Sequence, residues 1–161
     1  MDRPLTSALT AKRMSRPMSP ERLKEFSELS AFVNFFMTNV HGVSSANSAK
    51  ALDDIVQKFG MSKALTGLKQ ATNDTIEDLS GRPAEYIEIL DDALQAAGIL
   101  TVSEVRRRYA GSFQRILKRG SIKNETEYYL VNGIVVDLTS SVSNEERAQL
   151  QAMLDAYEHI S

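Results

Sequence analysis

The chain has 161 residues, a formal net charge of -2 at pH 7 and no cysteine. Its length suits a single domain, and its 42% of hydrophobic residues is enough to build a core. The lack of cysteine excludes disulfide frameworks, thiolate zinc sites and cysteine nucleophiles, and it fits a reducing compartment. The near-neutral charge excludes a polybasic or strongly acidic binder. A cytoplasmic location is expected, because no export signal is visible.

The N-terminal residues, 1–18, mix prolines with scattered basic residues and show no amphipathic period. They also lack the apolar segment of an export signal. We therefore predict a flexible N-terminal arm over residues 1–18 and a single helical domain over residues 19–161. The longest apolar-looking stretch, residues 29–40, is too short to cross a bilayer, so we expect no membrane contact.

The first predicted helix begins after Ser19, a good N-cap that is followed by Pro20 and Glu21. Apolar residues then recur three or four positions apart from Leu23 to Val40, which indicates one continuous apolar face. The same spacing, with glycines and capping residues at the boundaries, predicts further helices. Their approximate ranges are 48–59, 62–79, 83–98, 101–120 and 143 to the C-terminus.

The stretch TEYYLVNGIVVDL, residues 126–138, is compatible with two structures. Asn132 and Gly133 are the preferred pair of a type I′ hairpin turn, and the valines around them favour strands. Asn124 and Glu127 form a capping-box pattern, which favours a helix, although Gly133 inside a helix costs about 1 kcal/mol. An isolated hairpin is marginal and no other strand is predicted, so the helix is preferred.

These elements predict an all-α fold, a single compact bundle of six to seven helices. A small β-hairpin at residues 126–138 is the structural alternative.

No pattern of residues points to catalysis. The histidines, His41 and His159, are not brought near each other or near a carboxylate by any predicted element, and no phosphate-binding glycine loop is present. Adjacent aspartates at 53–54 and 91–92 diverge by about 100° around a helix, so neither pair converges on one ion. We expect no catalytic residue, no metal site and no cofactor.

Residues 54–70 have the outline of a helix-turn-helix, with a turn at Gly60 between two helices. The candidate DNA-reading residues of the second helix are Lys63, Thr66, Lys69 and Gln70. The pattern departs from the motif at Thr66, where an apolar residue is usual. A one-position slip turns the packed face of the helix by about 100°, so a plain helical hairpin is preferred.

Charge is segregated along the second half of the chain. Residues 101–123 carry seven bases against Glu104, whereas residues 73–92 carry seven acids against Arg82. These charges either pair within the molecule or leave a basic helix, residues 103–119, to bind phosphate or an acidic protein surface. The candidate partner- or phosphate-binding residues are Arg106, Arg107, Arg115, Lys118 and Arg119.

These patterns favour a non-enzymatic helical module for protein interaction or regulation. The expected partner is a protein, either a second copy in a homodimer or an acidic surface. The alternative is a nucleic-acid-binding protein that uses residues 54–70 or the basic helix at residues 103–119. Because nucleic-acid binding weakens steeply with salt, a salt titration separates the two hypotheses.

Overall fold

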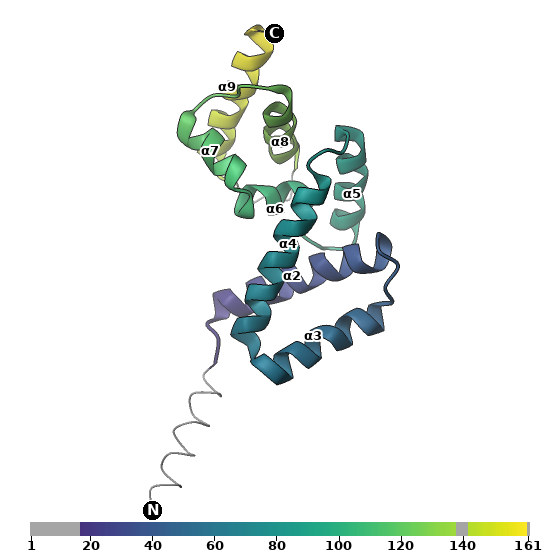
Figure 1. The fold of residues 1–161 in the computed structure, drawn as a ribbon. Helices are drawn as coiled ribbons and strands as arrows, with labels where there is room; N and C mark the ends of the chain where they lie inside the picture. The colour runs from purple at the N-terminus through teal and green to yellow at the C-terminus, as the bar shows by residue number, and fades with distance from the viewer. Residues whose placement is uncertain (1–16, 138–141, 161) are drawn as a thin grey trace, which may run out of the picture. The chain divides into compact units, whose positions relative to one another are not determined.

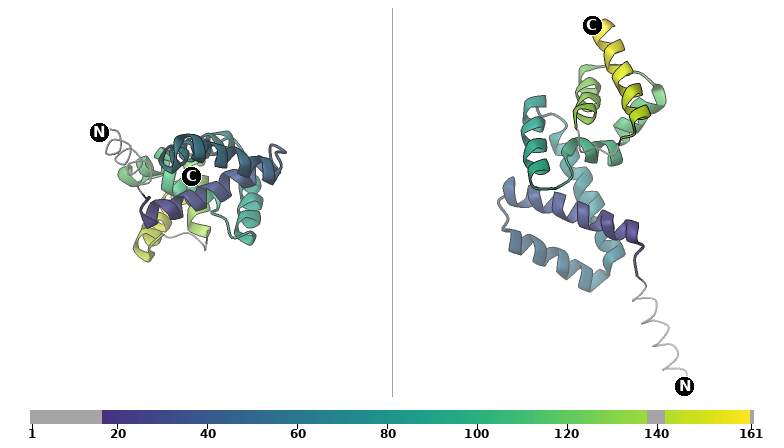
Figure 2. Two further views of the ribbon diagram at one scale, coloured as in Figure 1. Left: turned by 90° about the horizontal axis from the view of Figure 1, so that it is seen from below. Right: turned by 180° about the vertical axis from the view of Figure 1, so that it is seen from behind.

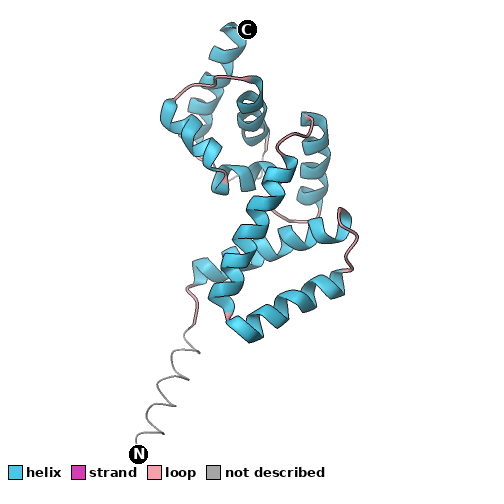
Figure 3. Cartoon of the chain, viewed as in Figure 1, coloured by secondary structure: helices cyan, strands magenta, loops and turns pink. Residues whose placement is uncertain are grey.

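A computed structural model describes residues 17–137 and 142–160 (Figure 1). These residues form eight α-helices joined by short loops and contain no strand (Figure 3). The prediction of an all-α fold is confirmed at this level. The predicted arm over residues 1–18 lies outside the described residues, apart from Pro17 and Met18. No helix in the described ranges is both long and apolar enough to cross a membrane.

The helices gather into two compact units, whose described residues are 17–71 in the first and 72–137 with 142–160 in the second. The boundary falls inside α4, Met61–Leu79, which contributes residues to both units. A single domain over residues 19–161 stays a prediction.

The first unit contains α2, Pro20–Asn39, and α3, Ser45–Phe59, which run side by side (Figure 1, Figure 2). Ser19 caps α2 as predicted, because its side chain accepts a hydrogen bond from the backbone N–H of Arg22. α3 begins three residues earlier than predicted, since Ser44 caps it in the same way. The buried apolar side chains of this unit are Leu29, Phe32, Phe36, Ala64, Leu65 and Leu68.

The second unit adds five helices to the end of α4. They are α5 (Ala84–Ala96), α6 (Val102–Tyr109), α7 (Gly111–Arg119), α8 (Glu125–Val136) and α9 (Asn144–Ile160). The last three of these helices surround one apolar cluster. Its buried members are Phe113, Ile116, Ile122, Val131, Ile134, Leu150, Met153 and Leu154.

The predicted basic helix over residues 103–119 is two helices, and this split raises the helix count above the predicted six to seven. Ala110 takes an extended conformation with ψ 117°, which breaks the helical hydrogen-bond pattern between Tyr109 and Gly111. Gly111 disfavours continuing the helix, because glycine costs about 1 kcal/mol relative to alanine in a helix interior. The basic residues of the range 103–119 therefore lie on two separate helices, α6 and α7.

Residues 126–136 are helical in α8, so the preferred prediction is confirmed for the residues up to Val136 and the hairpin alternative is wrong. Asn124 caps the helix through the backbone N–H of Glu127, at 2.9 Å. Gly133 is explained by packing rather than by a turn. A Cβ atom at Gly133 would lie 2.8 Å from the Oγ of Ser103, so only glycine lets α8 approach α6 this closely.

Candidate interaction surface

The helix α3 is amphipathic, yet none of its residues is buried. Ala51, Ile55 and Phe59 lie four residues apart and so line up along one side of the helix. All three residues are exposed, and the solvent-accessible fraction is 43% for Ile55 and 53% for Phe59. We refer to Ala51, Ile55 and Phe59 as the α3 ridge. It is an apolar line that the described part of its own unit, residues 17–71, leaves exposed.

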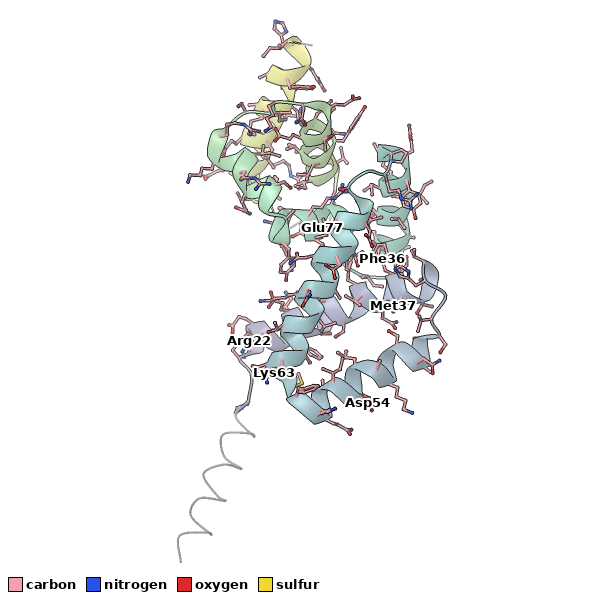
Figure 4. All side chains as sticks on the ribbon, viewed as in Figure 1. Arg22, Phe36, Met37, Asp54, Lys63 and Glu77 are labelled. Carbon is pink, nitrogen blue, oxygen red and sulfur yellow. The ribbon has the colours of Figure 1, made fainter. Side chains whose placement is uncertain are left out.

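The α3 ridge has one charged edge and one apolar edge, as follows from the helical spacing. Asp54, labelled in Figure 4, and Lys58 flank it on the first side, and both are exposed. Leu52 and Val56 flank it on the other side and are half-buried. Within the described part of the chain, neither Asp54 nor Lys58 makes an ion pair. An approaching surface would therefore meet apolar side chains beside an acid and a base that are both available.

Two lysines lie over the ring of Phe59 at the end of the ridge. The Nζ atoms of Lys58 and Lys63 are 5.4 Å and 5.9 Å from the ring centroid. Such exposed cation–π contacts are worth about 0.5–1 kcal/mol, so they orient the lysines without hiding the ring.

A polar row on α2 has buried oxygens whose hydrogen bonds are not satisfied within the described residues of the same unit. Ser30, Asn34 and Thr38 are four residues apart and lie in one line. A buried side-chain oxygen of each has no hydrogen-bond partner among the described residues. Asn34 does use its Nδ2 to donate to Ser45 Oγ, at 3.4 Å. Each buried oxygen left unpaired costs about 1–3 kcal/mol, which makes this unit less well satisfied internally than the second.

The predicted DNA-reading residues are all exposed on α4: Lys63, Thr66, Lys69 and Gln70. Their setting differs from a helix-turn-helix. Only Gly60, at φ 89°, separates α3 from α4, whereas that motif uses a turn of three or four residues. Lys69 also forms an ion pair with Glu25 at 3.2 Å. The structure thus brings these four residues to one helix without the turn that would present them to a groove.

The predicted basic residues of α6 are held by their own surroundings. Arg107 and Arg108 both pair with Glu104, at 2.6 Å and 2.8 Å, and only 2% of the Glu104 side chain is exposed. Arg106 is half-buried and donates to the carbonyl oxygen of Leu79 at 3.2 Å. Pairing with Glu104 of the same helix therefore accounts for Arg107 and Arg108, whereas Arg106 contacts Leu79 and feels the charge of Asp91, both in the acidic segment 73–92.

The predicted basic residues of α7 divide into paired and exposed ones. Arg119 forms an ion pair with Glu127 of α8. Arg115 and Lys118 are exposed, and among the described residues neither has an ion pair. Two cations therefore remain available of the five predicted to form one basic surface.

A pocket of about 770 Å³ lies within the second unit, between α5, α6 and α8. Its polar lining includes Ser103 of α6 and the two aspartates Asp91 and Asp137. Both aspartates accept hydrogen bonds from residues at the start of α6. Asp91 accepts from the backbone N–H of Val102 at 2.7 Å and from the Ser103 hydroxyl at 2.6 Å. The Thr101 hydroxyl donates to Asp137 and accepts from the backbone N–H of Glu104. These contacts anchor the N-terminus of α6 to α5 and to the end of α8.

Burial sets the electrostatics of this network. It raises the pKa of Asp91 above its ordinary value of 3.8, against the hydrogen bonds from Ser103 and Val102, and the negative charge of Asp137 adds to the rise. Burial likewise lowers the pKa of Arg106, while the Asp91 carboxylate opposes that shift. The described residues contain no group of three or more histidine, aspartate or glutamate side chains that could hold a metal ion.

The α3 ridge is not singled out by the sequence, because apolar residues at helical spacing ordinarily predict a buried face. Only the absence of a covering element among the described residues distinguishes it, and that is a tertiary property.

No protein-family model matches the chain, and neither a curated protein nor a solved structure matches it. Its function is therefore argued from its own geometry.

Proposed function

We propose that this chain is a non-enzymatic protein-interaction module that binds a protein partner through the α3 ridge. The observation that carries the proposal is the exposure of an amphipathic helix of 15 residues with no buried residue. A helix of this kind is stabilised mainly by covering its apolar face, because short helices are marginal in water by themselves. A protein partner supplies that cover.

The edges of the ridge support a protein partner in particular. Interfaces combine an apolar centre with a polar rim, and aromatic residues are enriched at their centres. Phe59 and Ile55 provide the apolar centre, while Asp54 and Lys58 provide a rim that carries both signs of charge. A rim of mixed charge selects a partner by complementarity rather than by net attraction. A cytoplasmic location remains an expectation.

Site-specific photo-crosslinking in the native cell tests this function. A benzophenone amino acid would replace Ile55 in one variant and Gln57 in the other. Both residues are exposed on α3, but they point to opposite sides of the helix. We expect covalent protein adducts from position 55 and none from position 57. A folded variant that gives no adduct at position 55 would contradict the proposal.

Nucleic-acid binding is the second candidate, and it rests on Arg115 and Lys118 of α7. Two phosphate contacts predict a shallow dependence of affinity on salt, with a slope of roughly -2 in log–log form for duplex DNA. Fluorescence anisotropy of duplex DNA from low to high salt tests it, with the variant Arg115→Glu/Lys118→Glu as the control. Binding that persists in this variant would exclude the α7 surface.

A further inference from the structure

We infer that the partner that covers the α3 ridge is a second copy of this chain, with the two α3 helices packed antiparallel about a two-fold axis at Ile55. The inference rests on the proposed interaction function and specifies its partner. It follows from the order of large, small and charged residues along the helix.

The apolar residues of the ridge complement their own copies in this arrangement. Ile55 lies on the axis and meets the partner's Ile55. Ala51 and Phe59 stand four residues to either side of it, so Ala51 comes level with the partner's Phe59. The small alanine leaves room for the aromatic ring, which is the fit that close packing requires.

The charged edge is also self-complementary. A two-fold axis perpendicular to the helices places equivalent edges of the ridge against each other, so the charged edge of one copy faces that of the other. Asp54 then lies near the partner's Lys58, offset by two residues or about 3 Å along the axis, which a lysine side chain spans. Symmetry repeats the pair, which gives the interface two ion pairs from residues that have none among the described residues of the single chain.

A parallel arrangement does not have this complementarity. Phe59 would meet the partner's Phe59, and Ala51 would meet the partner's Ala51, which leaves a gap at one end and crowding at the other. The charged edge of each copy would lie against the apolar edge formed by Leu52 and Val56 in the other. Asp54 and Lys58 would then be partly desolvated without a partner, which is unfavourable.

The size of the contact predicts a weak and reversible dimer. α3 has 15 residues and is therefore about 22 Å long. A single helix pair of this length falls among the small interfaces, below about 1,200 Å² in total, which are typical of transient complexes. Self-association should therefore depend on concentration, with a dissociation constant on the order of micromolar or weaker.

A charge-exchange experiment tests both the second copy and its orientation. The variants Asp54→Lys and Lys58→Asp each place like charges on the whole edge, positive in the first and negative in the second. Analytical ultracentrifugation would compare wild type, each variant alone and an equimolar mixture. We expect wild type to dimerise and each variant alone to do so about tenfold more weakly, because each change acts twice in the dimer. The mixture should regain dimers as a heterodimer of the two variants.

Three outcomes would overturn the inference. They are a wild-type chain that stays monomeric up to about 1 mM, variants that dimerise as well as wild type, and a mixture that does not regain the dimer. The variant Ile55→Glu, which brings two acids together on the axis, should also be monomeric, and circular dichroism would show that it remains helical.

The crosslinking experiment shows whether a failed test rejects only the second copy or also the proposed interaction function. If wild type is monomeric and position 55 is crosslinked to a different protein, the second copy is rejected and the interaction function stands. If position 55 gives no adduct, both are rejected.

Discussion

The two units of the chain differ in how far their helices bury an apolar face and in how fully their buried polar groups are hydrogen-bonded. In the second unit, Phe113 and its neighbours are fully enclosed, and the buried acid Glu104 is paired with two arginines. In the first unit, the α3 ridge is exposed, and three buried oxygens on α2 have no hydrogen-bond partner among the residues that the structure describes. Because uncovered apolar area and unpaired buried oxygens both reduce stability, we infer that a partner completes the first unit. The second unit also exposes single apolar side chains, such as Ile89 and Val136, but its helices α5 to α9 each have a buried face.

The sharpest contrast between the units is between two phenylalanines. Phe113→Ala should lower the free energy of unfolding by about 4 kcal/mol, because its side chain is fully buried in the core of the second unit. Phe59→Ala should change it by less than about 1 kcal/mol at low protein concentration, since this ring is already half exposed. Urea denaturation of both variants measures the difference. Equal losses would show that α3 is covered within the single chain.

The pairing of buried charge in the second unit predicts the next largest effect. Glu104→Gln should cost about 3 kcal/mol, because it leaves two half-buried arginines facing a neutral side chain. Glu127→Gln is the matched control. It removes one partner of the more exposed pair with Arg119 and should cost less than about 1 kcal/mol. Thermal denaturation would compare the two variants, and a larger loss for the control would refute this ranking.

The close approach of α6 and α8 predicts a smaller effect that depends on its neighbour. Gly133→Ala should destabilise the chain by about 1–2 kcal/mol, because its new Cβ would lie 2.8 Å from Ser103 Oγ. In a Ser103→Ala background the Oγ atom is absent, and the nearest atom of residue 103 is its Cβ, at 3.8 Å. Gly133→Ala should then stabilise the folded chain by up to about 1 kcal/mol, because alanine has the higher helix propensity. A double-mutant cycle measures the reversal of sign. Additive effects would mean that the contact does not exist.

The network at the start of α6 predicts a pH dependence that arises in the second unit. The pKa of Asp91 is raised by folding, so the folded chain holds this proton more tightly than the unfolded chain. Its contribution to stability is complete below pH 3.8, the ordinary value, and is lost as pH rises through the raised folded pKa. Asp91→Asn should remove this loss, whereas Asp92→Asn, at an exposed neighbour, should keep it. The free energy of unfolding, measured from pH 4 to pH 7, checks this pH dependence. Identical pH profiles for wild type and Asp91→Asn would contradict a contribution from Asp91.

Local structure was predictable where its cause lies within a few residues. Ser19, Thr101 and Ser143 cap helices as their sequence context predicts, because a cap needs only its own side chain and the next turn. Gly111 also carried a signal for the break between α6 and α7, but the capping box at Thr101 and the apolar spacing around it favoured one continuous helix.

Tertiary causes could not be predicted in the same way. Nothing near Gly133 in the sequence shows that Ser103 of another helix lies against it, and nothing near Glu104 shows that it is buried. The α3 ridge is the clearest example. Its four-residue spacing is the same as that of Phe32 and Phe36 on α2, which are buried, so the sequence pattern cannot separate a core face from an exposed one.

The most direct test of the contrast between the units is hydrogen–deuterium exchange of α3 and α8 at rising protein concentration. We predict that amides of residues 51–59 exchange faster than those of residues 128–136 at about 1 µM and become protected toward about 1 mM, as a partner covers the α3 ridge. The protection of α8 should not change. If α3 is as protected as α8 at the lowest concentration, its ridge is covered within the chain itself, and the central claim is wrong.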